Sequence, residues 1–318
     1  MRTEHHRIPA VGYGLYLIAA ALFGFNGTVA KTLLATGIPA ARLSELRVTF
    51  AFLVMLVIVI ATRPSALRIR SWAELRLLAG YGILGVMLTQ FLYFVSIHLI
   101  PVGITLIIEF TAPFMVALWF RFTRGDQLHR RVWLGMVMAL VGLVAIAEIW
   151  NGFSLNTLGV VCAWGAAVAL AVYYVLGERC VQEPWNRDSI SVTMWGFAGA
   201  SLVWAVVQPW WTFPWHYLQG QSEPWGTWGL QLPLWVLVLS MVLLGTVTTF
   251  WLVVASFRHI SSAQASSIGM AEPVLASVIA WVLIGEALGG WQIVGIAITT
   301  AGILVAERSR FLPSEHID

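Results

Sequence analysis

The chain has 318 residues, of which 59% are hydrophobic and only 10% are charged. Soluble domains carry about 25% charged residues, so this composition excludes an ordinary soluble protein and indicates one that lies in a membrane. The formal net charge of +3 is small, and the positions of the cations argue against nucleic acid as a partner.

Apolar segments long enough to cross a bilayer follow one another along the whole chain. A helix needs about 20 apolar residues to span about 30 Å of hydrocarbon. The first segment runs past the length of a signal-peptide core, so we expect it to be retained. The sequence therefore predicts an all-α membrane protein with ten transmembrane helices. The expected spans are 11–35, 41–62, 76–98, 101–122, 131–150, 156–178, 189–210, 232–257, 261–284 and 288–307.

The basic residues gather at alternate connections between these spans. If both termini are cytoplasmic, every arginine on a loop or at a helix end lies on the cytoplasmic side, except Arg42 at an outer end. The bias of Lys and Arg toward cytoplasmic loops therefore predicts cytoplasmic N- and C-termini in a multi-pass protein of the cell membrane.

The first two spans contain the only cations inside the apolar segments. Lys31, the single lysine, follows Asn26, which stands between two glycines that allow close approach of a backbone or ligand. In the second span, Arg42 and Glu45 are spaced for an ion pair, which leaves Arg47 to face inward. Lys31 and Arg47 either hold a substrate carboxylate or neutralise a buried acid, and a pair that only joins helices is an equal alternative.

Two glutamates lie near the middle of the membrane, each close to a proline. Glu109 precedes Pro113 in the fourth span, and Glu272 precedes Pro273 in the ninth. Proline removes a main-chain hydrogen bond, and loosened backbone inside a membrane is tolerated where it lines a cavity or water. A charge at that depth is costly, so it indicates function by default. We expect a substrate-binding or proton-coupling site here, and the alternative is a structural kink.

Further polar and aromatic residues are candidates for the same site. Each of them, taken alone, is more often part of the interior packing. They are Gln90, Tyr93, Trp164, Tyr173 and Gln264.

The two halves of the chain match each other at an offset of 160 residues without a gap, although the first two helices of each half align poorly at this offset. The matches fall on glycine, proline and serine, which coincide by chance less often than Leu, Val or Ile. The pairs are Gly85 with Gly245, Ser96 with Ser256, Pro113 with Pro273, Gly125 with Gly285, Gly135 with Gly295 and Gly142 with Gly302.

Two halves of five spans each have opposite orientations in the membrane, which is the inverted repeat of many secondary transporters. The expected domains are 1–152 and 153–310, followed by a tail at 311–318. The surplus residues of the second half form a Trp-rich outer loop at 211–231. We interpret this loop as a segment at the membrane interface, in preference to a lid over the substrate.

The sequence offers little for metal or covalent chemistry. Cys162 and Cys180 are about 27 Å apart along one predicted helix, too far for a disulfide. We find no metal-ligand cluster and no phosphate-binding or nucleophile motif, so we expect neither a metal nor a cofactor, and no enzyme activity.

Long stretches of the chain resemble a known family. "FGFNGTVAKTLLATGIPAARLSELRV", "IPVGITLIIEFTAP" and "AEPVLASVIAWVLIGEAL" are similar to the EamA branch of the drug/metabolite transporter superfamily, most of all to the inner-membrane threonine/homoserine exporters. The resemblance implies a ten-helix inverted-repeat carrier of the inner membrane. The matching positions are Lys31, Arg47, Glu109, Pro113, Glu272, Pro273 and Glu286.

The leading hypothesis is a secondary transporter that exports a small metabolite, such as an amino acid, by alternating access. A coupling proton is one role for the acids, and contact with a substrate ammonium is the other. An exporter of amphipathic or aromatic drugs on the same scaffold is the alternative, and a channel fits least. The substrate, the direction of transport and the oligomeric state stay open.

Overall fold

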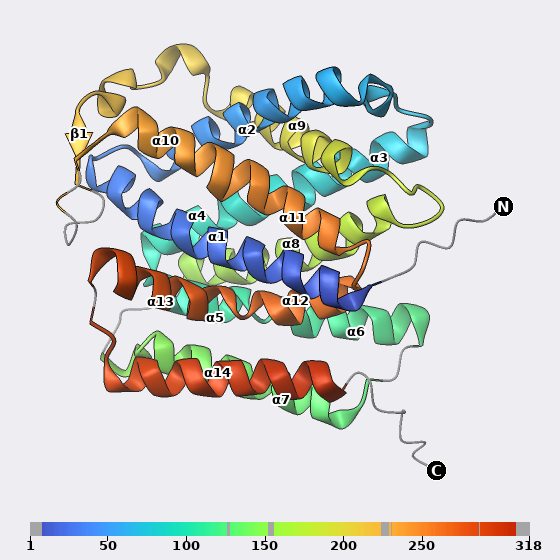
Figure 1. Ribbon diagram of the computed structural model, residues 1–318, viewed down its shortest axis with the longest axis vertical. Coiled ribbons are helices and arrows are strands. Elements are labelled where there is room, and N and C mark those ends of the chain that lie inside the picture. The colour runs from blue at the N-terminus through green and yellow to red at the C-terminus, as the bar shows by residue number, and fades with distance from the viewer. Residues whose placement is uncertain are drawn as a thin grey trace.

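The computed structural model describes residues 8–125, 128–151, 156–223, 229, 231–285 and 287–309. Asp126, Glu286, the tail at 311–318 and parts of the Trp-rich loop lie outside the described residues. Helices dominate the described part (Figure 1). The α-helices are α1 (Pro9–Ala35), α2 (Ala40–Thr62), α3 (Trp72–Gly80), α4 (Leu88–Leu99), α5 (Val102–Glu109), α6 (Ala112–Arg124), α7 (Arg130–Ile146), α8 (Thr157–Val181), α9 (Ser189–Val207), α10 (Leu234–Val242), α11 (Thr249–Ser256), α12 (Ser262–Gly269), α13 (Glu272–Ile284) and α14 (Gly290–Ser309).

Nine helical segments in the described residues are long and apolar enough to cross a membrane. The remaining predicted span, 131–150, corresponds to α7, which at 17 residues is slightly shorter than the usual crossing length. Where predicted and observed segments are compared, their ends differ by at most four residues, as at the start of the third span, predicted at 76 and observed at 72. The all-α fold and the order of its long helices are confirmed.

The fourth and ninth spans are each interrupted at the same place of the 160-residue alignment. The fourth divides into α5 and α6, and the ninth into α12 and α13, with bounds that agree residue for residue up to the last turn. Both second helices carry proline in their first turn, where the missing N–H costs nothing. Both end in a left-handed glycine, Gly125 and Gly285, each with φ +72°.

The third and eighth spans each contain a stretch of π-helix, η2 (Tyr81–Met87) and η7 (Leu243–Thr248). Each stretch holds a glycine against the first helix of the opposite half. A Cβ added at Gly85 would lie 3.0 Å from the Tyr173 Cα of α8, and one at Gly245 would clash with Asn26 of α1. These glycines allow the third helix of each half to approach the other half closely.

Helices α7 and α14 pack directly against each other through four glycines. A Cβ at Gly295 would lie 2.6 Å from the Gly142 carbonyl oxygen, and one at Gly302 would lie 2.6 Å from that of Gly135. The 160-residue offset exchanges these two contacts, so the pair is self-complementary. Small residues bring helix backbones together in this way in membranes.

We expect Gly142→Ala to destabilise the protein by about 1 to 3 kcal/mol, because a Cβ there would collide with Thr299 and with the Gly295 backbone. Gly14→Ala is the matched control, since a Cβ at Gly14 meets nothing within 4 Å. Thermal unfolding in detergent should show a lower midpoint for the first variant only. Equal midpoints would mean that the α7–α14 contact contributes little.

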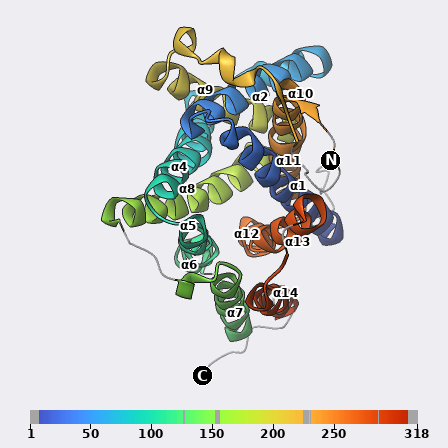
Figure 2. The ribbon, with the colours of Figure 1, turned by 90° about the vertical axis from the view of Figure 1, so that its left-hand side faces the viewer.

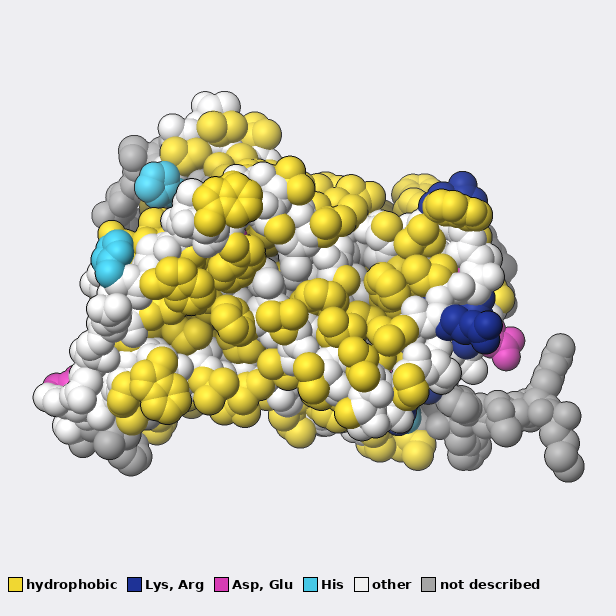
Figure 3. Space-filling view, turned by 90° about the horizontal axis from the view of Figure 1, so that it is seen from above, with side chains coloured by type: hydrophobic (Ala, Val, Ile, Leu, Met, Phe, Trp, Pro, Cys, Tyr) yellow, Lys and Arg dark blue, Asp and Glu magenta, His cyan; other side chains and the backbone are white. Residues whose placement is uncertain are grey.

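Basic residues mark one end of the bundle, which we call the basic end and define by Arg63, Arg124, Arg187 and Arg258. Arg187, only 4% exposed, donates to Glu74 at 2.5 Å, and Arg258 donates to the Arg187 carbonyl at 2.9 Å. Figure 3 shows Lys and Arg gathered at one end of a face whose middle part is largely hydrophobic. Such a surface suits a protein surrounded by lipid, with a polar layer at its ends.

Aromatic side chains crowd the opposite end, after α9. Short 3₁₀ turns, η4 (Trp210–Thr212) and η5 (Trp215–Leu218), are followed by a two-stranded antiparallel pair, β1 (Gln221–Ser222) and β2 (Leu232–Pro233). Arg42 joins this segment to α2, since it donates to Thr212 at 2.5 Å and pairs with Glu45 at 2.9 Å. The predicted Arg42–Glu45 pair is therefore present.

Candidate functional site

The two helix breaks place Glu109 and Glu272 at helix ends inside the bundle. Glu109 is the last residue of α5, and Glu272 is the first of α13. The chain turns at both breaks through equivalent hydrogen bonds, from the Thr111 amide to the Ile108 carbonyl at 3.0 Å and from the Ala271 amide to the Ile268 carbonyl at 2.8 Å. The acids are one turn apart in the repeat, so the acidic site is not symmetric.

The two carboxyl groups share neighbours. Glu109 is 8% exposed, whereas Glu272 is half-buried. They are close enough to interact electrostatically, and Tyr93 of α4 interacts with both. Glu272 also interacts with Tyr16 of α1 and with Tyr174 of α8. The neighbours of Glu272 therefore come from four other helices, α1, α4, α5 and α8.

Tyr16 and Tyr174 form a pair of hydroxyl groups beside the second break. Their oxygens share a hydrogen bond. A Cβ at Gly269, the residue aligned with Glu109, would lie 2.7 Å from the Tyr174 hydroxyl and 2.9 Å from the Tyr16 hydroxyl. Gly269 therefore leaves room for two hydroxyls in the second half where the first half has an acid.

Arg47 lies on α2, close to Tyr93 and without a carboxylate partner. Its Nη2 donates to Gln90 Oε1, which also accepts from the Ser44 hydroxyl at 3.3 Å. Arg47 Nε and Gln90 Nε2 are buried donors that find no acceptor. The ion pairs of the described residues do not include Arg47. The unused Nε of the Arg47 guanidinium and the unused Nε2 of Gln90 suit the oxygens of an anionic ligand.

Two predicted candidates have other roles. Gln264 uses its side chain locally, since it accepts from the Ser261 amide at 3.0 Å and donates to the Tyr13 hydroxyl at 2.8 Å. Trp164 is 46% exposed and belongs to an outward stripe of α8 with Val161 and Val168. The capping box therefore engages the Gln264 side chain, and Trp164 lies on an exposed face of α8; that either residue lines the site stays a prediction.

Three further candidates lie on α1 and α8. Tyr173 packs in an aromatic cluster and stacks on Tyr81 with ring centroids 5.3 Å apart. Asn26 is buried against Gly245, with its Oδ1 unpaired. Lys31 is exposed near the end of α1. The structure thus brings together Glu109, Glu272, Tyr93, Arg47 and Gln90.

The sequence interpretation missed Ser44, Tyr16 and Tyr174. A tyrosine pair at 173 and 174 gives no sign of which ring turns toward the acids, because the two differ by about 100° around the helix. Ser44 could have been found from its spacing, since it lies one turn before Arg47 and therefore on the same face of α2, which meets Gln90. Among the described residues, His, Cys, Asp and Glu form no group able to hold a metal ion.

Comparisons with known proteins agree with this architecture. The EamA-like transporter family matches residues 10–147 and again 157–307. The threonine/homoserine exporter RhtA of Salmonella typhimurium (strain SL1344) is 31% identical over 173 residues, 52% of this chain and 53% of that protein. RhtA of Escherichia coli (strain K12) is 31% identical over 175 residues, 53% and 54% of the two chains.

Two more matches extend the comparison. A probable amino-acid metabolite efflux pump of Escherichia coli (strain K12) is 27% identical over 184 residues, 57% of this chain and 58% of that protein. A solved crystal structure at 19% identity has a TM-score of 0.77, over 95% of this chain and 98% of the other, which shows the fold. The alignments span about half the length of these curated relatives.

Proposed function

Because this chain belongs to the EamA-like transporter family, we propose that it is a secondary transporter that exports amino acids or similar small zwitterions across the cytoplasmic membrane by alternating access. The observation that carries the proposal is that a cation and two acids lie near the same tyrosine inside the bundle. Arg47, which has no carboxylate partner among the described residues, lies near Tyr93, and so do Glu109 and Glu272. This arrangement complements a molecule with one carboxylate and one ammonium group.

The carboxylate of the substrate would bind between Arg47 and Gln90. Arg47 Nε and Gln90 Nε2 are unused buried donors, and each loses hydration without gaining a partner. Leaving such groups unpaired costs about 1 to 3 kcal/mol each, more for the charged one. A substrate carboxylate would satisfy both, so binding there is favoured over the empty site.

The ammonium group of the substrate would bind near Glu109 and Glu272. Two carboxylates near each other in a low-dielectric interior repel, and a cation between them relieves the repulsion. A proton is the other cation able to do this, so binding of the substrate and of a proton would compete. Such competition is one way to couple export to proton entry.

Alternating access needs two halves that move against each other. Support for an inverted repeat comes from the aligned breaks, the paired π-helical stretches and the exchange of contacts between α7 and α14. We assign the basic end to the cytoplasm by the positive-inside bias. Both termini are then cytoplasmic, since α1 begins and α14 ends there (Figure 1).

Threonine tests this function on the purified protein. We expect threonine at about 100 times its Kd to raise the midpoint of thermal unfolding, since binding to the folded state then adds about 2.7 kcal/mol. Its methyl ester, which lacks the carboxylate, and its N-acetyl form, which lacks the ammonium, should give no shift. A shift from the ester and from aromatic cations, with none from amino acids, would instead favour an exporter of amphipathic drugs, for which the Tyr16, Tyr93 and Tyr174 rings are suited.

A further inference from the structure

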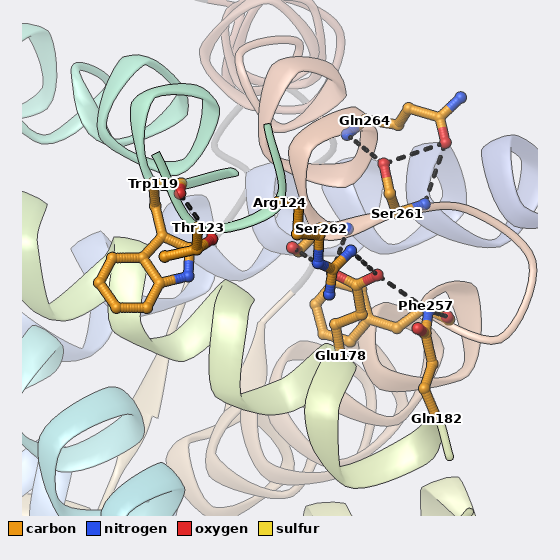
Figure 4. Close-up of polar contacts among 9 residues, drawn as sticks. All are labelled: Trp119, Thr123, Arg124, Glu178, Gln182, Phe257, Ser261, Ser262 and Gln264. Atoms are coloured by element: carbon orange, nitrogen blue, oxygen red, sulfur yellow. Dashed lines mark hydrogen bonds and ion pairs between the residues drawn. The ribbon is translucent and has the colours of Figure 1, made fainter. Parts of the chain in front are cut away.

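Three helices converge at the basic end of the bundle, beyond the site proposed above. They are the end of α6, the end of α8 and the start of α12 (Figure 4). Helix α12 packs against both α6 and α8. Packing of comparable extent does not join α5 to α13, the equivalent pair at the opposite end, in the part of the chain that the structure describes. The contact between α6 and α12 is therefore a feature of the basic end that the repeat does not reproduce in the described residues.

One buried carboxylate makes the polar contacts of this junction. Glu178 of α8 is 1% exposed. Its Oε2 accepts from the Ser262 amide at 3.1 Å and from the Ser262 hydroxyl at 2.5 Å. Its Oε1 accepts from Gln182 at 2.9 Å and lies 3.8 Å from the Arg124 guanidinium of α6. A carboxylate at a helix N-terminus is favoured by both the free amides and the helix dipole.

Helix α12 does not depend on this carboxylate for its own N-terminal cap. Ser261 and Gln264 form a capping box, in which the Ser261 hydroxyl accepts from the Gln264 amide at 3.3 Å and the Gln264 side chain accepts from the Ser261 amide at 3.0 Å. The Glu178 contact is thus an addition that joins α12 to α8. It can break while α12 stays helical, because water can replace the carboxylate at an opened helix end.

We propose that Glu178 is a gate residue, which holds the basic end of the bundle closed by accepting hydrogen bonds from Ser262. This inference rests on the proposed function, in which the basic end faces the cytoplasm. Release of Ser262 would detach the start of α12 from α8, while the hydrogen bond from Gln264 to Tyr13 still joins α12 to α1. Helix α12 leads directly to Glu272, about 15 Å further along the chain if both helices are counted at helical rise. Opening of this gate would give cytoplasmic substrate a route to the acids.

A reporter cysteine in α12 tests the gate without any knowledge of the substrate. Ser266→Cys is placed one turn beyond Ser262, where the native side chain is 1% exposed, in a background with Cys162→Ala and Cys180→Ala. The readout is the rate of modification by a membrane-impermeant maleimide, applied to inside-out and to right-side-out vesicles.

We expect Glu178→Ala to raise the labelling rate about tenfold in inside-out vesicles, the factor that follows the loss of a hydrogen bond to a charged group. Ser262→Ala, which keeps the amide contact, should raise it less, and the double variant no more than Glu178→Ala alone. Glu183→Gln, an exposed acid of the same end, is the matched control and should change nothing.

Unchanged labelling from both faces in Glu178→Ala and in Ser262→Ala would overturn the gate. If Glu178→Ala does not accumulate as a folded protein, Ser262→Ala decides alone. Faster labelling in right-side-out vesicles would support the gate and contradict the orientation proposed above. Faster labelling in inside-out vesicles, in a protein that binds no amino acid, would support the gate and contradict the proposal that amino acids are the substrate.

Discussion

Transport of amino acids should fall at least about thirtyfold in Arg47→Gln, because the loss of one partner of a buried charged pair costs about 2 to 5 kcal/mol. Arg47→Lys should retain part of the activity, since it keeps the charge but not the forked donor geometry. The measurement is efflux of labelled substrate from proteoliposomes. The fold should survive, because a buried cation without a carboxylate partner costs at least about 2.5 kcal/mol, and Gln removes that cost.

Stability separates this role from a structural one. If Arg47 only joined helices, Arg47→Gln would lower the midpoint of thermal unfolding; for a substrate contact we expect the midpoint to stay or to rise. Arg76→Gln is the matched control, because Arg76 is exposed at the start of the third span. Full transport by Arg47→Gln would remove the carboxylate site from the proposal.

Much of the fold could be predicted because the membrane imposes it. Helices must satisfy their own backbone in lipid, so apolar length alone locates them, as for α2, predicted at 41–62 and observed at Ala40–Thr62. Proline gives an equally strong local signal. The α5–α6 and α12–α13 breaks lie just before Pro113 and Pro273, because proline suits the first turn of a helix and not its interior.

The composition of the site was harder to predict, because it depends on the rotation of each helix. Trp164 and Tyr173 lie nine residues apart on α8, yet one is 46% exposed and the other 6%. Hydrophobic periodicity fails to separate them, since lipid and protein interior are both apolar. Gln264 is a candidate polar residue of the site by sequence, and only tertiary structure shows Tyr13 as its partner.

The gate at Glu178 had no signal in the sequence either. An acid near the cytoplasmic end of a span is ordinary, and nothing in the local pattern shows that it reaches Ser262, which is 84 residues away. The same holds for Glu74 and Arg187, which pair across 113 residues. Contacts between distant segments decide which charges at a membrane surface are exposed to water and which hold helices together.

Glu272 and Glu109 should have different roles, which we expect to see in the kind of transport that each Gln variant loses. In Glu272→Gln we expect amino-acid binding, and with it all transport, to fall at least about thirtyfold, because the substrate ammonium loses a buried charged partner. Glu272 suits this role, since it begins α13, where the helix dipole favours a negative charge. The loss of a threonine-induced rise in the thermal midpoint measures binding directly.

Glu109 lies at the C-terminal end of α5, where the helix dipole opposes a negative charge, so we assign it the coupling proton. Glu109→Gln, a permanent mimic of the protonated acid, should keep exchange of labelled for unlabelled amino acid but lose accumulation driven by a pH gradient. Glu183→Gln is the control for both measurements. Wild-type accumulation by Glu109→Gln would show that no proton passes through this residue, whereas loss of exchange would place it with Glu272 at the ammonium, because exchange needs binding and reorientation but no net proton movement.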